Sequence, residues 1–189
     1  MTKNIMIVGV GGQGTLLASR LLGHTLTELG YDVKISEVHG MSQRGGSVVT
    51  YVRYGDKVSS PIIEKGTADV ILAFEQLEAA RSLPYLAPGG KLIMNTQKID
   101  PMPVITGAAE YPSQIPETIQ GMGVDLVAVD ALSLAEKCGS SKAVNVVLLG
   151  VASKFLGIDR ALFEKSIEEL VKPRFIQINK DAFNAGADY

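Results

Sequence analysis

The stretch that decides the fold is Ile5-Met6-Ile7-Val8-Gly9-Val10-Gly11-Gly12-Gln13-Gly14, an apolar run that passes directly into a glycine-rich turn. An apolar run that is continuous rather than alternating is typical of a strand buried on both faces of a sheet. Leucines follow the turn at helical spacing, at positions 17, 21, 22, 26 and 29. We therefore predict a buried strand over residues 3–10 and a helix over residues 13–29.

Strand-like and helical runs alternate along the rest of the chain. Gly55-Asp56 is predicted to be a hairpin turn, which requires a mixed rather than purely parallel sheet. The fold class that follows is α/β: a three-layer Rossmann-like domain over residues 1–189, with a mostly parallel (mixed) sheet and a helical C-terminal third. The further strands are expected at residues 32–36, 47–54, 70–74, 91–94, 104–105 and 124–129, and the further helices at residues 76–86, 143–156, 159–172 and 175–189.

Composition excludes several functional classes. The formal net charge of −2 provides no basic field for nucleic acid. No apolar run reaches membrane-spanning length, and the start Met-Thr-Lys-Asn lacks a signal-peptide core. The expected location is therefore cytoplasmic, with neither nucleic acid nor membrane as a partner.

The count of metal-binding residues is equally restrictive. The single cysteine, Cys138, cannot ligate an iron–sulfur cluster, and with only His24 and His39 beside it no metal-ligand set is visible. Any redox metal is therefore expected on a partner. No Ser–His–acid or Cys–His spacing is evident, so we assign no catalytic residue to this chain. Cys138 is expected to be buried filler, and His24 a structural residue within its helix.

The first turn has the G-x-G-x-x-G pattern between a strand and a helix. Gly11, Gly12, Gln13 and Gly14 are candidate ligand-binding residues, because glycines allow close backbone approach and the helix N-terminus presents N–H groups to an anion. NAD is one candidate ligand, with Glu37 at the position of the ribose-binding acid, and glycines needed only for packing are another explanation. The polar Gly-Gly-Gln-Gly sequence, and a long glycine-bearing loop opening at Glu37, weaken the NAD interpretation.

The second turn is Glu37-Val38-His39-Gly40-Met41-Ser42-Gln43-Arg44-Gly45-Gly46, and it is expected at the same edge of the sheet. Arg44 is suited to a carboxylate or phosphate because its guanidinium donates two parallel hydrogen bonds. An ordinary loop hydrogen bond for His39 and a solvated or internally paired Arg44 remain alternatives. The candidate site residues here are Glu37, His39, Met41, Ser42, Gln43, Arg44 and Gly45, while Glu75 and Asn95, at the ends of later strands, are assigned structural roles.

Together the two turns resemble the gamma-type domain of the 2-oxoacid:ferredoxin oxidoreductases. Leu72-Ala73-Phe74-Glu75-Gln76-Leu77-Glu78-Ala79 is also similar to that family, and the resemblance covers most of the chain. Pyruvate-type members tend to have a Pro-Glu-Arg-Arg-Gly-like second turn. The His-Gly-Met-Ser-Gln-Arg-Gly-Gly form here resembles the beta subunits of the indolepyruvate ferredoxin oxidoreductases.

This resemblance implies an accessory subunit of an anaerobic enzyme that oxidatively decarboxylates aryl-pyruvates to aryl-acetyl-coenzyme A and reduces ferredoxin. It also implies a larger alpha subunit carrying thiamine diphosphate, Mg and [4Fe–4S] clusters, and turns that face its active site and help to hold coenzyme A or substrate. The chain lacks the Gly-Asp-Gly stretch with following asparagines that usually binds thiamine diphosphate. The isolated chain is accordingly expected to bind no cofactor firmly and to be inactive.

Three alternatives stay open at this point. One is the gamma subunit of another ferredoxin oxidoreductase, for pyruvate, 2-oxoglutarate or 2-oxoisovalerate. The second is a free-standing NAD-dependent dehydrogenase, which predicts nucleotide binding by the isolated chain. The third is a nucleotide-sensing or assembly module without turnover.

Overall fold

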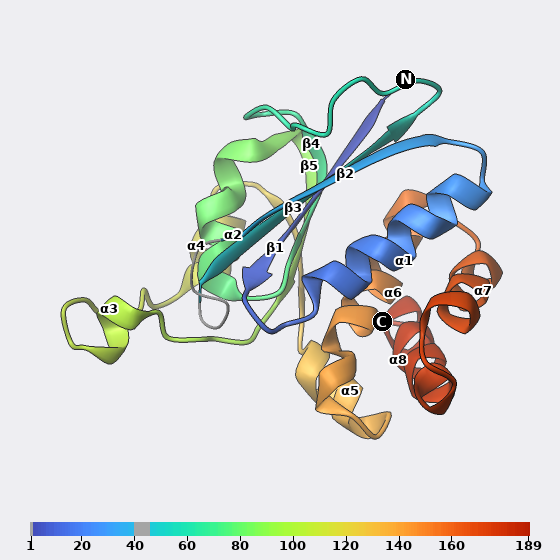
Figure 1. The fold of residues 1–189 in the computed structure, drawn as a ribbon. Helices are drawn as coiled ribbons and strands as arrows, with labels where there is room; N and C mark the ends of the chain where they lie inside the picture. The colour runs from blue at the N-terminus through green and yellow to red at the C-terminus, as the bar shows by residue number, and fades with distance from the viewer. Residues whose placement is uncertain (1, 40–45) are drawn as a thin grey trace.

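The computed structural model describes residues 2–39 and 46–189, and within them one mixed sheet runs through the molecule (Figure 1). Its strand order is β2-β3-β1-β4-β5-β6. β1, β4, β5 and β6 are parallel, whereas β3 is antiparallel to both of its neighbours. The predicted mixed sheet is therefore confirmed. The strands are β1 (Lys3–Val10), β2 (Asp32–His39), β3 (Ser47–Gly55), β4 (Ala68–Ala73), β5 (Leu86–Asn95) and β6 (Asp125–Val129).

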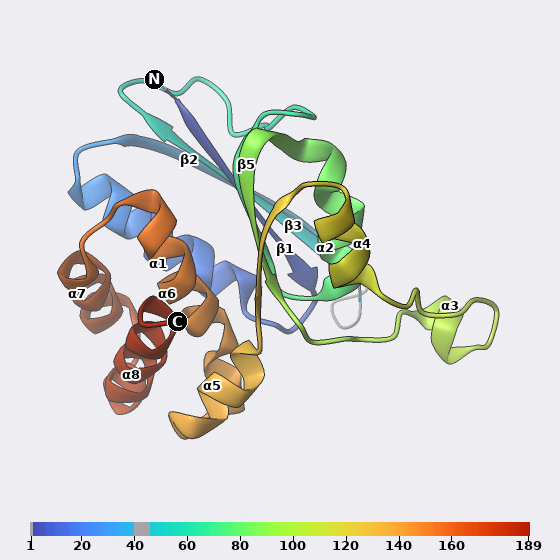
Figure 2. The same cartoon turned by 180° about the vertical axis from the view of Figure 1, so that it is seen from behind.

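Helices cover both faces of the sheet, as Figures 1 and 2 show from opposite sides. Ile5 and Ile7 of β1 face one core, formed with α1, α6, α7 and α8, while Met6 and Val8 face a second core formed with α2 and α4. This confirms three layers and a helical C-terminal third. The helices are α1 (Thr15–Glu28), α2 (Gln76–Ser82), α3 (Met102–Ile105), α4 (Ile115–Gly121), α5 (Ala131–Lys137), α6 (Val144–Leu156), α7 (Arg160–Leu170) and α8 (Ile176–Ala187).

The hairpin does not lie where the sequence placed it. β2 and β3 pair along their whole length, from Asp32 opposite Gly55 to His39 opposite Val48. The connection of this hairpin is therefore residues 40–46, and Gly55 is the last paired residue of β3 rather than a turn. The chain then runs from β3 to β4 without a further strand. This connection is fastened to the start of β2, because the Asp32 carboxylate accepts a hydrogen bond from the Val58 amide (2.8 Å).

Two other predictions were wrong, in both cases because of proline. The predicted strand at residues 104–105 is the end of the short helix α3, which begins beside Pro101 and Pro103 because proline suits the first helical turn. The predicted helix over residues 76–86 ends as an α-helix at Ser82 and tightens into a 3₁₀ turn around Pro84, which lacks the N–H needed to continue it.

The predicted helix starts and stops in the last third are confirmed. Asp159 precedes α7, and its carboxylate accepts a hydrogen bond from the Ala161 amide (2.9 Å), as an N-cap does. α7 ends at Leu170, shortly before Pro173. In the described part of the chain, no helix combines the length and the apolar character needed to cross a membrane.

The two helices α6 and α8 touch backbone to backbone. α6 is buried over residues 144–153, and Gly150 and Gly186 lie at its crossing with α8. A Cβ atom at Gly186 would lie 1.9 Å from the Val147 carbonyl oxygen, and one at Gly150 would lie 2.1 Å from the Phe183 carbonyl oxygen. Only glycine at both positions allows this crossing, because the atoms that a side chain would meet belong to the backbone.

We expect Gly186→Ala to lower the free energy of unfolding by about 1–3 kcal/mol, because overpacking at a rigid backbone contact forces the helices apart. Gly121→Ala is the matched control, since Gly121 is also helical but a Cβ atom there would meet nothing within 4 Å. The control should be neutral or about 0.5–1 kcal/mol more stable. Urea unfolding of the isolated chain measures both, and equal stabilities would contradict the close crossing.

Candidate functional site

The candidate site lies where the parallel strands β1, β4, β5 and β6 end, since ligands of open α/β sheets bind at the carboxyl edge. The first turn follows β1 there, and its Gly11 amide donates a hydrogen bond to the Gly46 carbonyl oxygen (2.8 Å). Gly46 closes the second turn, so the described end of that turn touches the first one. Met41, Ser42, Gln43, Arg44 and Gly45 lie outside the described residues, and their assignment to the site stays a prediction.

Gln13 holds the first turn together from inside. Its side-chain Oε1 accepts a hydrogen bond from the Val10 amide (2.8 Å), and its Nε2 donates to the Phe74 carbonyl oxygen (2.9 Å) at the end of β4. The Nε2 also lies 3.3 Å from Oε1 of Gln97. The Gln13 amide group is thus committed to the protein, and the polar residue that weakened the NAD interpretation joins two strand ends.

Two buried asparagines that the motifs did not single out for a binding role complete this edge. Asn95, at the end of β5, donates to the Phe74 carbonyl oxygen (3.1 Å) and accepts from the Ala131 amide (3.3 Å). Asn145, at the start of α6, donates from Nδ2 to the Gly14 carbonyl oxygen (3.1 Å). These contacts agree with the structural role predicted for Asn95. Asn145 was missed, because it lies 131 residues from Gly14 in a run that reads as plain helix.

Glu37 and His39 lie on β2, the edge strand of the sheet. Glu37 is opposite Thr50, which in turn is opposite Ile7, so β3 separates Glu37 from β1. Two strand spacings amount to about 10 Å. Glu37 also lies inside β2 rather than opening the loop, and accepts a hydrogen bond from the Thr50 hydroxyl (3.2 Å). His39 is the last residue of β2 and is exposed. It is opposite Val48 of β3, which is in turn opposite Gly9 at the end of β1.

A polar hollow of about 480 Å³ opens beside the first turn. Gly12, Gln13 and Gly14 form one wall, and Gln97, Ser141 and Lys142 contribute polar groups. Gly14 is the N-cap of α1 in the left-handed conformation and has no side chain to cap the first amides, which in any helix point toward the N-terminal end. Lys142 is the cation of this hollow, and the motif analysis did not identify it.

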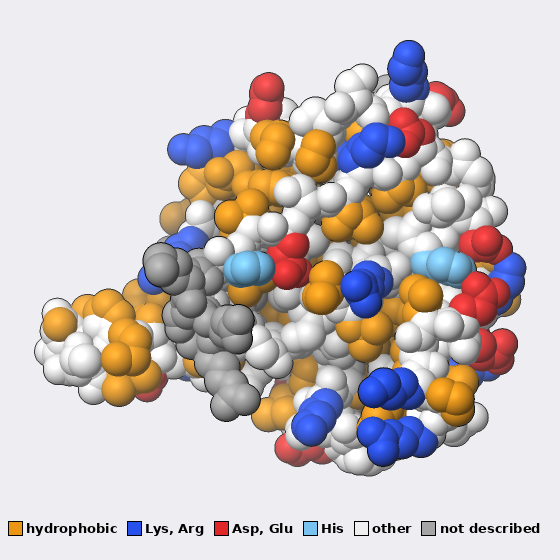
Figure 3. All heavy atoms as spheres, viewed as in Figure 1, with side chains coloured by type: hydrophobic (Ala, Val, Ile, Leu, Met, Phe, Trp, Pro, Cys, Tyr) orange, Lys and Arg blue, Asp and Glu red, His pale blue; other side chains and the backbone are white. Residues whose placement is uncertain are grey.

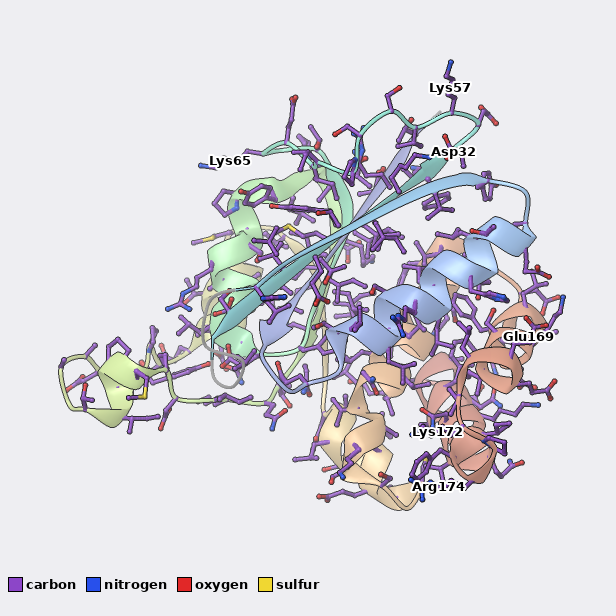
Figure 4. The ribbon with its side chains drawn as sticks, in the orientation of Figure 1. Asp32, Lys57, Lys65, Glu169, Lys172 and Arg174 are labelled. Atoms are coloured by element: carbon purple, nitrogen blue, oxygen red, sulfur yellow. The ribbon has the colours of Figure 1, made fainter. Side chains whose placement is uncertain are left out.

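Lys142 also lines a second, apolar hollow of about 310 Å³. Leu17, Ala143, Val171, Phe175 and Ile178 form most of its walls. Lys172, a further lining residue, and Arg174 come from the segment between α7 and α8 (Figure 4). On the face shown in Figure 3, Lys and Arg side chains gather among hydrophobic ones at the lower right of the view. A polar and an apolar hollow that share a lysine are suited to a long ligand with an anionic and an apolar part.

A Ser–His–acid contact is present that the sequence did not reveal. His24 of α1 places Nδ1 3.0 Å from the Ser166 hydroxyl oxygen and Nε2 3.0 Å from the Glu169 carboxylate of α7 (Figure 4 labels Glu169). Ser166 is only 1% exposed, donates to the Leu162 carbonyl oxygen and lies 2.8 Å from the Thr25 hydroxyl. A buried hydroxyl with these partners is no nucleophile, so this contact fastens α1 to α7, which is the structural role predicted for His24.

Within the described residues, no group of three or more His, Cys, Asp and Glu side chains is placed to hold a metal ion. Cys138 follows the last turn of α5 and packs against the core, as predicted, but it is half-buried rather than buried. Burial and the nearby Asp181 carboxylate raise the pKa of its thiol, which therefore stays protonated near neutral pH. A protonated thiol is a weak nucleophile and metal ligand.

Comparison with known proteins identifies the family. The model of the pyruvate ferredoxin/flavodoxin oxidoreductase family matches residues 4–189. This chain belongs to that family. It is 42% identical to the indolepyruvate oxidoreductase subunit IorB of Thermococcus kodakarensis, over 97% of this chain and 93% of that protein. The resemblance that the two turns suggested is thereby confirmed.

Solved structures of this family share the fold. The pyruvate oxidoreductase subunit PORC of Thermotoga maritima matches with a TM-score of 0.76 at 23% identity, over 99% of this chain and 96% of that one. A 2-oxoglutarate:ferredoxin oxidoreductase from Magnetococcus marinus, solved with 2-oxoglutarate, coenzyme A and succinyl-CoA, also gives a TM-score of 0.76 at 19% identity. This chain spans 30% of that longer protein. Family membership and the displaced Glu37 together disfavour a free-standing NAD-dependent dehydrogenase.

The role of Gln13 is testable by Gln13→Leu, which keeps the bulk of the side chain but removes all three of its side-chain hydrogen bonds. We expect the free energy of unfolding to fall by about 1–3 kcal/mol, because the Val10 amide loses this partner. Gln97→Leu is the control, since Gln97 is also half-buried but its side chain accepts only the longer contacts at 3.3 and 3.4 Å. If Gln13→Leu unfolds like the wild type in urea, Gln13 is not what holds the turn.

Proposed function

We propose that this chain is the accessory, beta-type subunit of an indolepyruvate ferredoxin oxidoreductase. The enzyme would oxidatively decarboxylate aryl-pyruvates to aryl-acetyl-coenzyme A with ferredoxin as the electron acceptor. The observation that carries the proposal is the near full-length match to four IorB subunits, at 36–42% identity over 93–96% of each relative. Ketoisovalerate oxidoreductase subunits and a 2-oxoglutarate synthase subunit match at 28–29% identity.

The division of labour between subunits follows from the residues that the chain has. A [4Fe–4S] cluster takes several thiolates, and the chain has one cysteine. The larger alpha subunit would therefore carry the clusters, together with thiamine diphosphate and Mg, which supply the decarboxylation and electron-transfer chemistry. This chain would complete the active site from its carboxyl edge, and ferredoxin would be reached through the complex. The proposed location is cytoplasmic.

We further propose that the two adjoining hollows hold part of coenzyme A. The phosphates would lie in the polar hollow by Lys142 and the N-terminus of α1, where N–H groups and a cation favour anions. The apolar hollow would take an uncharged part of the same ligand. Volumes of about 480 and 310 Å³ are in the range of ligand pockets. Arg44, which lies outside the described residues, joins this proposal on the strength of its sequence context alone.

The proposed function is tested by producing this chain together with an alpha subunit of the indolepyruvate ferredoxin oxidoreductases from the same organism, under anaerobic conditions. We expect a brown complex that reduces ferredoxin with indolepyruvate and coenzyme A, and no turnover by the isolated chain. The same assay with pyruvate, 2-oxoglutarate and 2-oxoisovalerate compares substrates by kcat/KM. A complex that prefers one of these would keep the family and overturn the aryl-pyruvate assignment.

Lys142→Gln tests the coenzyme A site within that complex. We expect the KM for coenzyme A to rise by about tenfold with little change in the KM for indolepyruvate, since a charge-assisted contact contributes about 1.5–3 kcal/mol. Lys137→Gln is the control, because Lys137 is an exposed lysine in the last turn of α5 that lines neither hollow. An unchanged KM for coenzyme A in Lys142→Gln would place the ligand elsewhere.

A further inference from the structure

Between β5 and α4 the chain leaves the body of the molecule and returns to it, over residues 98–113. This segment, the arm, carries α3 and projects well beyond the sheet and the other helices in both views (Figures 1 and 2). It begins at the carboxyl end of β5, the edge of the sheet that holds the glycine turn and the polar hollow.

The base of the arm is held by one buried carboxylate. Glu75 is 1% exposed, and its Oε1 accepts hydrogen bonds from the Ile99 amide (3.2 Å) on the outgoing side and from the Tyr111 hydroxyl on the returning side. The Leu77 amide donates to the same hydroxyl (3.2 Å). Both sides of the arm are therefore fastened to the start of α2, so the arm projects from a built base.

Burial and the adjacent Glu75 carboxylate raise the pKa of the Tyr111 hydroxyl well above its ordinary value. The hydroxyl consequently keeps its proton and remains a hydrogen-bond donor throughout the physiological range. A phenol that donates to a buried carboxylate is a charge-assisted contact, which is stronger than a neutral one.

The tip of the arm has the opposite character to its base. Residues 101–109 read Pro-Met-Pro-Val-Ile-Thr-Gly-Ala-Ala and contain no ionisable side chain, in a chain of which 20% is charged. Met102 is 65% and Ile105 64% exposed, and no residue of α3 is buried. A four-residue helix has no stability of its own in water. The tip thus presents exposed apolar side chains on a short helix of which no residue is buried.

We propose that the arm docks into an uncharged, apolar recess of the larger subunit of the oxidoreductase complex. The proposal rests on the proposed function, which places that subunit over the carboxyl edge from which the arm projects. A partner that covers this edge meets the arm as a continuation of the same surface. The absence of charge along nine residues matches a recess that desolvates its contents, because a charged tip would lose its hydration there without a counter-ion.

The test is assembly of the full complex with Met102→Glu/Ile105→Glu. The control is Ile62→Glu/Met122→Glu, which places the same charges at a Met and an Ile that are 66% and 53% exposed outside the arm. Each variant is titrated with the alpha subunit, and the Kd is measured by light-scattering detection of the complex. We expect the Kd to rise at least tenfold for the arm variant and less than twofold for the control.

Tyr111→Phe examines the base independently, because it keeps the ring and removes the hydroxyl that donates to Glu75. We expect a smaller rise in Kd, of about threefold to tenfold, with the isolated variant still folded by circular dichroism. Weaker assembly of Tyr111→Phe, in which the tip is intact, would show that the Glu75–Tyr111 contact orients the arm for docking. An unchanged Kd would show that this contact is not needed to orient the arm.

The outcomes separate the two proposals. If the wild-type chain and the alpha subunit do not associate, the proposed function fails. If they associate and the arm variant binds as tightly as the control, the docking role of the arm is overturned. Self-association of the isolated wild-type chain that the arm variant abolishes, with complex formation unaffected, would instead assign the arm to a second copy of this chain.

Discussion

The antiparallel insertion of β3 between β1 and β2 is the constraint on which the rest of the site depends. It places Ile7, Thr50 and Glu37 in one row across three strands, so the acid that a dinucleotide fold would hold beside β1 lies one strand away. The same hairpin returns the chain to the end of β1, where the Gly11–Gly46 hydrogen bond joins the two glycine turns. One feature of topology thus removes a nucleotide site and brings two loops together.

The parts of the fold that were predicted are those encoded by local patterns. Residues 5–10 are a continuous apolar run, which predicts a strand buried on both faces of the sheet. Residues 144–156 are apolar almost all round, which predicts a buried helix, and neither inference needs knowledge of the neighbouring elements. The Asp159 cap and the stop near Pro173 are likewise local, because they depend on one side chain and the adjacent backbone.

The errors come from contacts between distant residues or from ambiguous local signals. Gly55-Asp56 has the composition of a hairpin turn, but pairing of Gly55 with Asp32 uses it as the end of a strand. The His24–Ser166 contact joins residues 142 positions apart, and no spacing rule along one helix can reveal it. Proline in residues 101–103 favours the first turn of a helix as readily as a loop, so α3 and the arm could not be foreseen.

The distribution of polar contacts is consistent with the proposal that this chain works with a partner. Gln13, Asn95 and Asn145 each bind backbone groups at the carboxyl edge, so their side chains build the turn and are not free to act on a substrate. The hollow beside them keeps Lys142, Ser141 and the backbone of a helix N-terminus, groups that can hold an anion but cannot cleave a carbon–carbon bond. Under the proposed function, the described part of this edge would bind an anion and supply half of an active site. The other half would then come from the partner surface that closes over it, and the uncharged tip of the arm projects from the same edge.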